Sequence, residues 1–231
     1  VEIGYPRPSG TIGGAGTYVH NFSKRLVKMS HDVTVICGKM DNDISFFSDG
    51  PVKVYPIIIG VAGSAGWAEH HYGYLERYLD MGFAVFSLHS FKSRNVESTI
   101  GDQLKVTIPM VLYDAFMALN KLADDKNIDI YNAGITGWSL GGGVSLFSAW
   151  SPIQEIISPN LKFSAHLPFY PPCIVMPDVL KFNNVPIHIL AGEMDDWVPA
   201  AACNEIVVAA KNAGYDIGIT IYPGASHSFD R

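Results

Sequence analysis

A glycine-flanked serine stands between a predicted strand and a predicted helix. The segment Gly134–Gly143 contains the pattern Gly-x-Ser-x-Gly, with Ser139 at its centre. In such a sharp turn the serine oxygen stands free at the end of the strand, and glycines are needed because the backbones approach too closely for a Cβ. The helix that follows directs its amino end at the reacting oxygen, where backbone N–H groups favour negative charge. The pattern predicts that Ser139 is a nucleophile.

A serine nucleophile needs a base, and the base needs an orienting acid. In a strand–turn–helix of this kind the expected chain order is Ser, then Asp or Glu, then His. Asp195 follows a predicted strand and is favoured over Asp196, although both aspartates could instead cap the helix that begins at Ala200. His227 is the only one of the 8 histidines that comes after this acid, and it lies in a loop after the last predicted strand. We therefore expect a triad of Ser139, Asp195 and His227.

Acyl transfer through a serine also needs two N–H groups that stabilise the negatively charged oxygen of the intermediate. One is the backbone N–H of Leu140, the residue after the nucleophile. The other is expected from the small-residue loop after the predicted strand Val54–Ile59, with Ser64 as first choice and Gly63 as alternate. The simpler interpretation of this loop is a glycine turn.

These residues need a scaffold that brings distant loops together. Short β-branched runs bounded by Gly, Pro or Asp alternate with helical stretches, which is typical of an α/β domain with a largely parallel sheet. The predicted strands are Val33–Cys37, Val54–Ile59, Ala84–Leu88, Ala133–Thr136, Pro186–Ala191 and Ile217–Tyr222. The predicted helices are Tyr72–Met81, Thr107–Ala123, Gly142–Ala149 and Ala200–Ala213. The candidate triad residues follow the carboxyl ends of these strands.

Composition excludes several classes of protein. With 48% hydrophobic and 16% charged residues, the 231-residue chain has ample material for a buried core. A net charge of −6 argues against a nucleic-acid binder and leaves no basic patch for an anionic membrane, and no uncharged run is long enough to span a bilayer. The three cysteines, Cys37, Cys173 and Cys203, are too few for a disulfide scaffold or a zinc knuckle. Cys173 and Cys203 either pair, if the fold brings them together, or are buried thiols.

From about residue 44 to residue 231 the chain resembles the dienelactone hydrolase family of α/β-hydrolases. The resemblance rests on Gly-Trp-Ser-x-Gly-Gly-Gly, Gly-Glu-x-Asp-Asp-Trp and His-Ser-Phe-Asp, and on a set of single residues: Trp67, His70, His71, Tyr72, Ser90, Phe91, Arg94, Phe169, Tyr170, Pro171, Cys173 and Pro199. It implies an α/β-hydrolase fold, a mostly parallel central sheet flanked by helices. It also implies the triad Ser139, Asp195 and His227, with no metal or organic cofactor.

The resemblance suggests substrate contacts as well. Trp138 is expected at the substrate site, and Arg94 either binds a substrate carboxylate through a bidentate contact or is simply exposed. The chain departs from the family pattern at the nucleophile, because the namesake lactonases carry Cys where Ser139 stands. Many relatives also have His where Ala62 stands and an acid where His89 stands, so dienelactone itself is a doubtful substrate.

Residues 1–43 differ in character from the rest. The glycine loop Gly13–Gly16, an amphipathic helix and a strand resemble the first βα unit of nucleotide-sugar glycosyltransferases over residues 1–39. We interpret residues 1–43 as a structural or foreign segment and residues 44–231 as the hydrolase domain.

No helix follows the His227 loop, so the fold is expected to be truncated at its C-terminus. The sequence begins at Val1 without an initiator Met or a charged-then-apolar leader, so a signal peptide is either absent or lost, and we expect a cytoplasmic protein.

The sequence thus favours a serine hydrolase that cleaves a small ester or lactone through an acyl-enzyme. A peptidase or acetyl-esterase of the same fold, or a non-catalytic hybrid chain, stays open because a fold does not fix a reaction. The expected partner is a small-molecule substrate, with neither nucleic acid nor a membrane. The sequence leaves the oligomeric state unknown.

Overall fold

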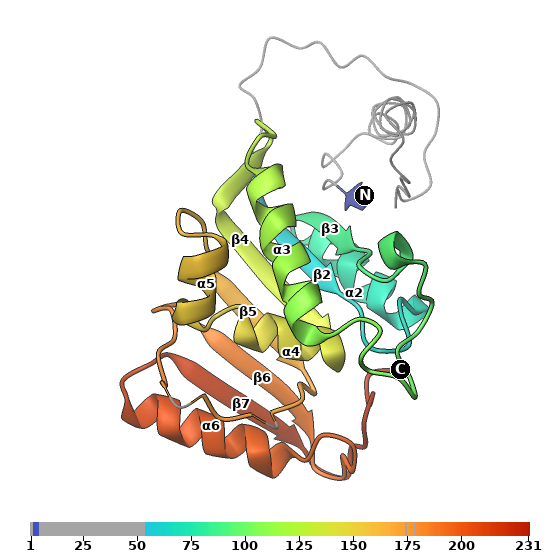
Figure 1. Ribbon diagram of the computed structural model, residues 1–231, viewed down its shortest axis with the longest axis vertical. Coiled ribbons are helices and arrows are strands. Elements are labelled where there is room, and N and C mark those ends of the chain that lie inside the picture. Colours follow the sequence, from blue (N-terminus) through green and yellow to red (C-terminus); the bar gives the residue numbers. More distant parts are fainter. Residues whose placement is uncertain (1, 5–53, 174, 178) are drawn as a thin grey trace.

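The structure is a computed structural model that describes residues 2–4, 54–173, 175–177 and 179–231. In this part of the chain a seven-stranded sheet runs in the order β1-β3-β2-β4-β5-β6-β7 (Figure 1). Its strands are β1 (Glu2–Gly4), β2 (Tyr55–Val61), β3 (Ala84–Leu88), β4 (Ile128–Trp138), β5 (Ala165–Phe169), β6 (Ile187–Gly192) and β7 (Ile217–Tyr222). All neighbouring pairs are parallel except β1 with β3. The carboxyl ends of β2 to β7 therefore share one edge of the sheet.

Helices cover both faces of this sheet. They are α2 (Glu69–Asp80), α3 (Ile108–Leu122), α4 (Leu140–Phe147), α5 (Ser151–Ile157) and α6 (Ala200–Asn212), with a 3₁₀ turn η1 at Lys92–Arg94. Alternate residues of β2 show the two faces: Ile57 and Ile59 pack in the cluster that contains α3, whereas Ile58 packs with α2. No helix among these described elements is long and apolar enough to cross a membrane.

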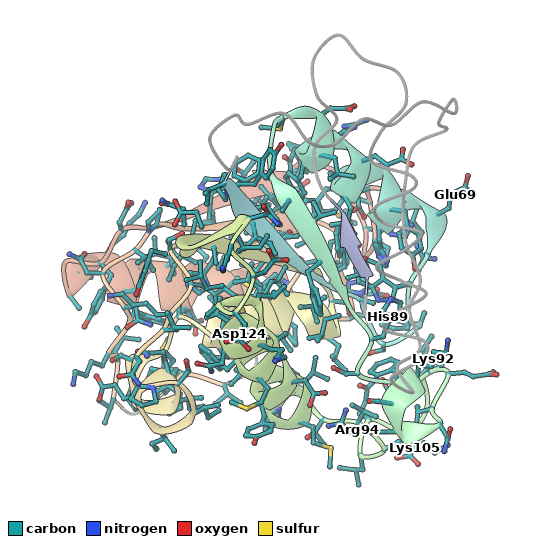
Figure 2. All side chains as sticks on the ribbon, turned by 90° about the horizontal axis from the view of Figure 1, so that it is seen from above. Glu69, His89, Lys92, Arg94, Lys105 and Asp124 are labelled. Atoms are coloured by element: carbon teal, nitrogen blue, oxygen red, sulfur yellow. A yellow bond between two sulfur atoms is a disulfide. The ribbon has the colours of Figure 1, made fainter. Side chains whose placement is uncertain are left out.

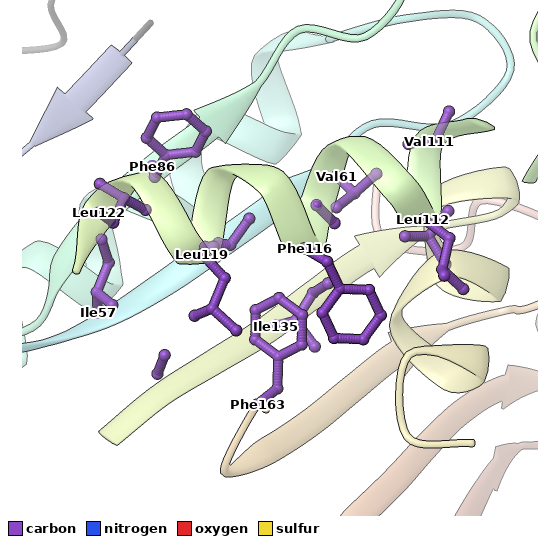
Figure 3. Packing of buried hydrophobic residues seen from close by; sticks show 14 of the residues in the cluster. Ile57, Val61, Phe86, Val111, Leu112, Phe116, Leu119, Leu122, Ile135 and Phe163 are labelled. Atoms are coloured by element: carbon purple, nitrogen blue, oxygen red, sulfur yellow. The ribbon is translucent and has the colours of Figure 1, made fainter. Parts of the chain in front are cut away.

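The core on the α3 side is dense. Phe116 and Leu119 of α3 are fully buried, and they pack in one cluster with Ile57, Ile135 and Phe163 (Figure 3). Burial of side chains of this size stabilises the fold by about 1.5–3 kcal/mol each. This packing fixes β2 and β4 beneath α3, and both strands lead directly into the candidate site.

The predicted elements within the described residues are confirmed, with ends shifted by no more than three residues except at β4, which begins at Ile128 rather than at Ala133. The strands β1 and β5, the helix α5 and the turn η1 were not predicted. β5 contains Pro168, which cannot donate a ladder hydrogen bond and normally argues against an interior strand. Here β5 lies between β4 and β6. The short helix α5 begins with Ser151-Pro152 and follows α4 almost directly, so its pattern merges with that of α4. The predicted strand Val33–Cys37 lies outside the described residues.

The amino-terminal segment is described only at β1. Glu2, Ile3 and Gly4 pair with Ser87, Phe86 and Val85 of β3, so this end of the chain adds an antiparallel strand to the sheet. The glycine loop Gly13–Gly16 and the proposed division of the chain at residues 43 and 44 fall outside the described residues. The glycosyltransferase resemblance receives no support from the structure.

Two cysteines are joined across the fold. Cys173, in the segment after β5, forms a disulfide with Cys203 of α6, with the two Cα atoms 5.0 Å apart. The structure thus decides between the two alternatives for this pair in favour of a disulfide. It fastens the segment after β5 to the helix that covers β6 and β7.

Candidate active site

Ser139 occupies a strained turn between β4 and α4. Its backbone has φ 54° and ψ −113°, a conformation that residues with a Cβ adopt only when the surroundings impose it. The surroundings are tight: a Cβ on Gly137 would lie 2.2 Å from the carbonyl oxygen of Gly141, and one on Gly141 would lie 2.1 Å from that of Val61. Only glycine fits at both positions. The N–H of Ser139 donates to the carbonyl oxygen of Phe169 at 3.0 Å, which ties the turn to β5.

The structure brings the three predicted triad residues into one hydrogen-bonded line. Nε2 of His227 lies 3.0 Å from Oγ of Ser139, and Nδ1 of His227 lies 2.7 Å from Oδ2 of Asp195. The three residues come from the loops after β4, β6 and β7, whose carboxyl ends meet at one edge of the sheet. This order of contacts is the one by which a base activates a serine hydroxyl and an acid orients the base.

Asp195 rather than Asp196 faces the imidazole. The Asp195 side chain has no solvent exposure, and its second oxygen, Oδ1, accepts the backbone N–H groups of Trp197 at 3.0 Å and Val198 at 2.9 Å. These bonds fix the carboxylate in one orientation, with Oδ2 left for His227. The alternative in which the two aspartates cap α6 finds no support, because the helix is capped by Pro199 without a side-chain hydrogen bond.

The small-residue loop after β2 passes directly against the nucleophile. A Cβ on Gly63 would lie 3.4 Å from Cβ of Ser139 and 3.0 Å from the carbonyl oxygen of Trp138. Two hydrogen bonds hold the next residue, Ser64. Its hydroxyl donates to Oε1 of Gln103 at 3.3 Å, and its carbonyl oxygen accepts the N–H of Thr99 at 2.8 Å. Leu140 is the first residue of α4, so its N–H has no acceptor within the helix. Both predicted oxyanion donors therefore belong to segments that border Ser139.

A cavity of about 390 Å³ opens over the triad. Two aromatic rings flank the imidazole inside it. The indole of Trp197 stacks on His227 with ring centres 5.3 Å apart, and Tyr170 meets His227 edge-on at 4.7 Å. The residues that line this cavity are Gly63, Ser64, Ala65, Gly66, Ala68, His71, Ile100, Trp138, Ser139, Tyr170, Asp196, Trp197, Ser226, His227, Ser228 and Arg231. A larger cavity of about 580 Å³ shares only Gly66 with it and contains none of the triad.

His71 contributes a neutral imidazole to this cavity. Its Nδ1 accepts the backbone N–H of Ala68 at 3.1 Å, so the ring proton resides on Nε2. Burial, with a smaller effect of the neighbouring His70, lowers the pKa of His71 to about 3. At neutral pH His71 is therefore an uncharged wall of the cavity.

The two predicted substrate contacts differ in their placement: Trp138 lines the triad cavity, whereas Arg94 does not. The Trp138 side chain is fully buried, where it packs on Phe169, and its Nε1–H donates to Asp230 at 2.9 Å. Trp138 therefore borders the triad cavity, and its indole is held by contacts within the protein. Arg94 lies on η1 close to Lys92 (Figure 2). It binds Asp114 of α3 with both guanidinium nitrogens, at 2.6 and 3.0 Å.

This ion pair raises the pKa of Arg94, chiefly through the hydrogen bonds to Asp114. The arginine is absent from the lining of the triad cavity. The bidentate geometry expected for a substrate carboxylate is thus used by a carboxylate of the protein itself. Arg94 is not retained as a substrate contact, whereas a substrate contact by Trp138 stays a prediction.

Sequence analysis named His71, Tyr170 and Trp197 only as parts of the family resemblance, without a role in the site, and did not name Arg231. Tyr170, His71 and Arg231 line the triad cavity but belong to no spacing pattern that predicts this location. Trp197 lies two residues after the acid, and this proximity along the chain is the one signal that could have indicated it. The other three come from segments that only the folded sheet brings together.

Comparison with known proteins agrees with this architecture. The sequence profile of the dienelactone hydrolase family matches residues 46–231. No curated protein matches the chain. Among solved structures, a candidate dienelactone hydrolase from Klebsiella pneumoniae subsp. pneumoniae MGH 78578 superposes with a TM-score of 0.61 at 20% identity, over 78% of this chain and 79% of that chain.

Two further solved structures have a similar fold. Esterase 2 of Thermogutta terrifontis, in its apo form, gives a TM-score of 0.60 at 19% identity, over 79% of this chain and 77% of that chain. The α/β-hydrolase MGS-M1 from a Medee basin deep-sea metagenome gives a TM-score of 0.57 at 19% identity, over 76% of this chain and 71% of that chain. With the profile match, these similarities show that the chain belongs to the dienelactone hydrolase family and is an ester hydrolase with the α/β-hydrolase fold.

Proposed function

We propose that the protein hydrolyses a small carboxylic ester or lactone through an acyl-enzyme formed on Ser139. The observation that carries this proposal is the hydrogen-bonded line from Ser139 through His227 to Asp195, with contacts of 3.0 and 2.7 Å. A line of this kind is what a serine needs to become a nucleophile at neutral pH.

The reaction proceeds in two halves. Oγ of Ser139 attacks the ester carbonyl carbon while Nε2 of His227 takes the hydroxyl proton. The C–O bond to the alcohol then breaks, and His227 returns the proton to the leaving alkoxide. A water molecule, deprotonated by the same imidazole, attacks the acyl-enzyme and releases the acid. Asp195 keeps the Nδ1–H of His227 in place and stabilises the imidazolium that forms at each attack.

The negatively charged oxygen of each tetrahedral intermediate requires fixed donors. We assign these to the backbone N–H groups of Leu140 and Ser64. Gly63 supports this assignment, because its lack of a side chain lets the loop lie within van der Waals distance of Ser139. Removal of one such donor typically costs about 3–4 kcal/mol of transition-state stabilisation.

The size of the site indicates a small substrate. A cavity of about 390 Å³ lies at the lower end of the range for small-molecule sites, about 300–1,000 Å³. The proposed steps use side chains and backbone N–H groups of the protein, so they require neither a metal nor an organic cofactor. The expected partner is the ester or lactone itself.

The cellular location stays a prediction. The sequence favoured the cytoplasm, yet disulfides are rare in cytoplasmic proteins of mesophiles and common in oxidising compartments. The Cys173–Cys203 disulfide therefore favours an oxidising compartment over the cytoplasm.

Labelling with a fluorophosphonate probe tests the proposed function. The expected result is an adduct on the peptide that contains Ser139, found by mass spectrometry, together with hydrolysis of p-nitrophenyl acetate. Ser139→Ala should lose both, and His227→Ala should lose most of the labelling rate. Ser93→Ala, which changes an exposed serine of η1, is the matched control and should keep both. Absence of any adduct on wild-type protein that unfolds cooperatively would refute the proposal.

A further inference from the structure

A second carboxylate, Asp230, connects the His227 loop to the nucleophile side of the site. Its two oxygens accept from two different side chains. The indole Nε1–H of Trp138 donates to Oδ2 at 2.9 Å, and the hydroxyl of Tyr170 donates to Oδ1 at 2.8 Å. These contacts span 92 and 60 positions of the sequence, so they join segments that are otherwise unrelated in the chain.

Both donors adjoin the nucleophile. Trp138 is the residue immediately before Ser139, and Tyr170 follows Phe169, whose carbonyl oxygen accepts the Ser139 N–H at 3.0 Å. Asp230 lies three positions after His227 in the chain. The carboxylate therefore bridges the loop that carries the base and the two strand ends that hold the nucleophile.

The two donors are firmly held. Trp138 has 0% and Tyr170 has 2% of its surface exposed. The Tyr170 backbone has a φ of 35°, which a residue with a side chain adopts only when its surroundings impose it. Its ring contacts both His227, at 4.7 Å between ring centres, and Phe229, at 5.5 Å. An anchor at Asp230 thus restricts the whole segment from His227 onward.

The hydrogen-bond roles are set by the chemistry of the partners. An indole N–H can only donate, and an ionised carboxylate can only accept. Burial and the nearby Asp230 raise the pKa of Tyr170, so the phenol keeps its proton and acts as a donor. Hydrogen bonds to an ionised acceptor are stronger than those between neutral groups. Both contacts therefore favour one placement of the loop.

We infer that Asp230 is a positioning residue that holds the His227 imidazole in line with Ser139. It is distinct from Asp195, which contacts the imidazole directly, because Asp230 acts only through Trp138, Tyr170 and the backbone of its own loop. This inference rests on the proposed function, since it concerns the geometry of the proposed triad. A displacement of about 1 Å at a reacting group can cost roughly 100-fold in rate.

Asp230→Ala is the primary test. With p-nitrophenyl acetate as substrate, kcat should fall by roughly 10- to 100-fold, whereas KM should change by less than about threefold, because the loss concerns alignment in the transition state. The rate of fluorophosphonate labelling at Ser139 should fall in parallel. A residue that only stabilises the fold would lower the unfolding temperature without this selective loss of kcat.

Asp230→Asn is the conservative variant. The Asn carbonyl oxygen can accept from Trp138, and its amide can donate to the Tyr170 hydroxyl, which accepts as well as donates. Asn should therefore recover kcat to within about fivefold of wild type, a factor that corresponds to the loss of charge alone. Asp124→Ala removes an exposed carboxylate at the end of α3 and is the matched control, with kcat and KM unchanged.

The outcomes separate this inference from the proposed function. If wild type itself forms no Ser139 adduct, the proposed function fails. Suppose instead that wild type is labelled at Ser139. The positioning role is then refuted if the Asp230→Ala variant is folded and keeps kcat within twofold of wild type, or if Asp230→Asn is as impaired as Asp230→Ala. If Asp230→Ala does not fold, Tyr170→Phe serves as the test of the positioning role, because it removes one of the two hydrogen bonds to Asp230. It should lower kcat by about three- to tenfold with KM unchanged, and an unchanged kcat would overturn the inference.

Discussion

The Nε2 atom of His227 lies 3.0 Å from the Ser139 hydroxyl, although 88 positions separate the two residues in the chain. The contact exists because β4 and β7 are both members of one parallel sheet and end at the same edge. Asp195 completes the line from β6, which lies beside β7. The predictions below test different parts of this arrangement.

Asp195→Asn should reduce kcat by about 10³- to 10⁴-fold. Oδ1 of Asp195 accepts two backbone N–H groups, so the Asn oxygen must take that position and its NH₂ must face Nδ1 of His227. Nδ1 then has to accept, which places the imidazole proton on Nε2 and leaves no base toward Ser139. Steady-state kinetics provide the measurement. The same change at Asp196 should lower kcat by less than tenfold, and equal losses at both positions would contradict the assignment of the acid.

Replacements of Ser64 separate its backbone from its side chain. Ser64→Ala keeps the N–H that we assign to the oxyanion, so kcat should stay within a few-fold of wild type. Ser64→Pro has no N–H and should lose about 10²- to 10³-fold in kcat. Circular dichroism and thermal unfolding confirm that both variants are folded. A large loss in the alanine variant would instead point to the hydroxyl, which contacts Gln103 at 3.3 Å.

Stability should fall as the pH drops from 6.5 to about 4, in part because of His166. This histidine is buried, and burial lowers its pKa from 6.5 to about 4. The unfolded chain takes up the proton near pH 6.5 but the native protein does not, so protons favour unfolding throughout this interval. For a shift of this size the contribution is about 3 kcal/mol, complete above pH 6.5 and lost below about 4.

The matched variant for this effect is His166→Asn. Its amide can still donate to the carbonyl oxygen of Ser145, which Nδ1 of His166 contacts at 2.8 Å, but it does not titrate. Urea unfolding at pH 7.5 and pH 4.5 should show a smaller decrease in the free energy of unfolding for the variant than for wild type. Equal decreases would show that His166 does not contribute.

Cys203→Ser should destabilise the protein by about 3–4 kcal/mol, because the disulfide closes a loop with a sequence separation of 30. The loss should be matched by Cys173→Ser and by wild type under reducing conditions. Thiol counting in denaturant checks the bond itself: reduction should release the two thiols of Cys173 and Cys203. No increase in reactive thiols on reduction would show that the bond is absent.

Local sequence was sufficient for the main features of the site. The turn at Ser139 is specified by neighbouring residues, because Gly137 and Gly141 are required by contacts within that turn and with the adjacent end of β2. Asp195 and His227 could be predicted because each follows a β-branched strand, and the strands of a parallel sheet end at one edge. Strand, turn and order along the chain are short-range properties that a sequence displays directly.

The tertiary structure alone decided which side chains meet. The indole of Trp138 is buried and donates to Asp230, while Arg94, expected either to bind a substrate carboxylate or to be exposed, binds Asp114. The strand β5 was not predicted because it contains Pro168, and the pairing of Cys173 with Cys203 was one of two alternatives. In each case the deciding contact joins residues at least 20 positions apart, or depends on a neighbouring strand. Such contacts depend on how strands and loops stack, and no local pattern of residue types determines that.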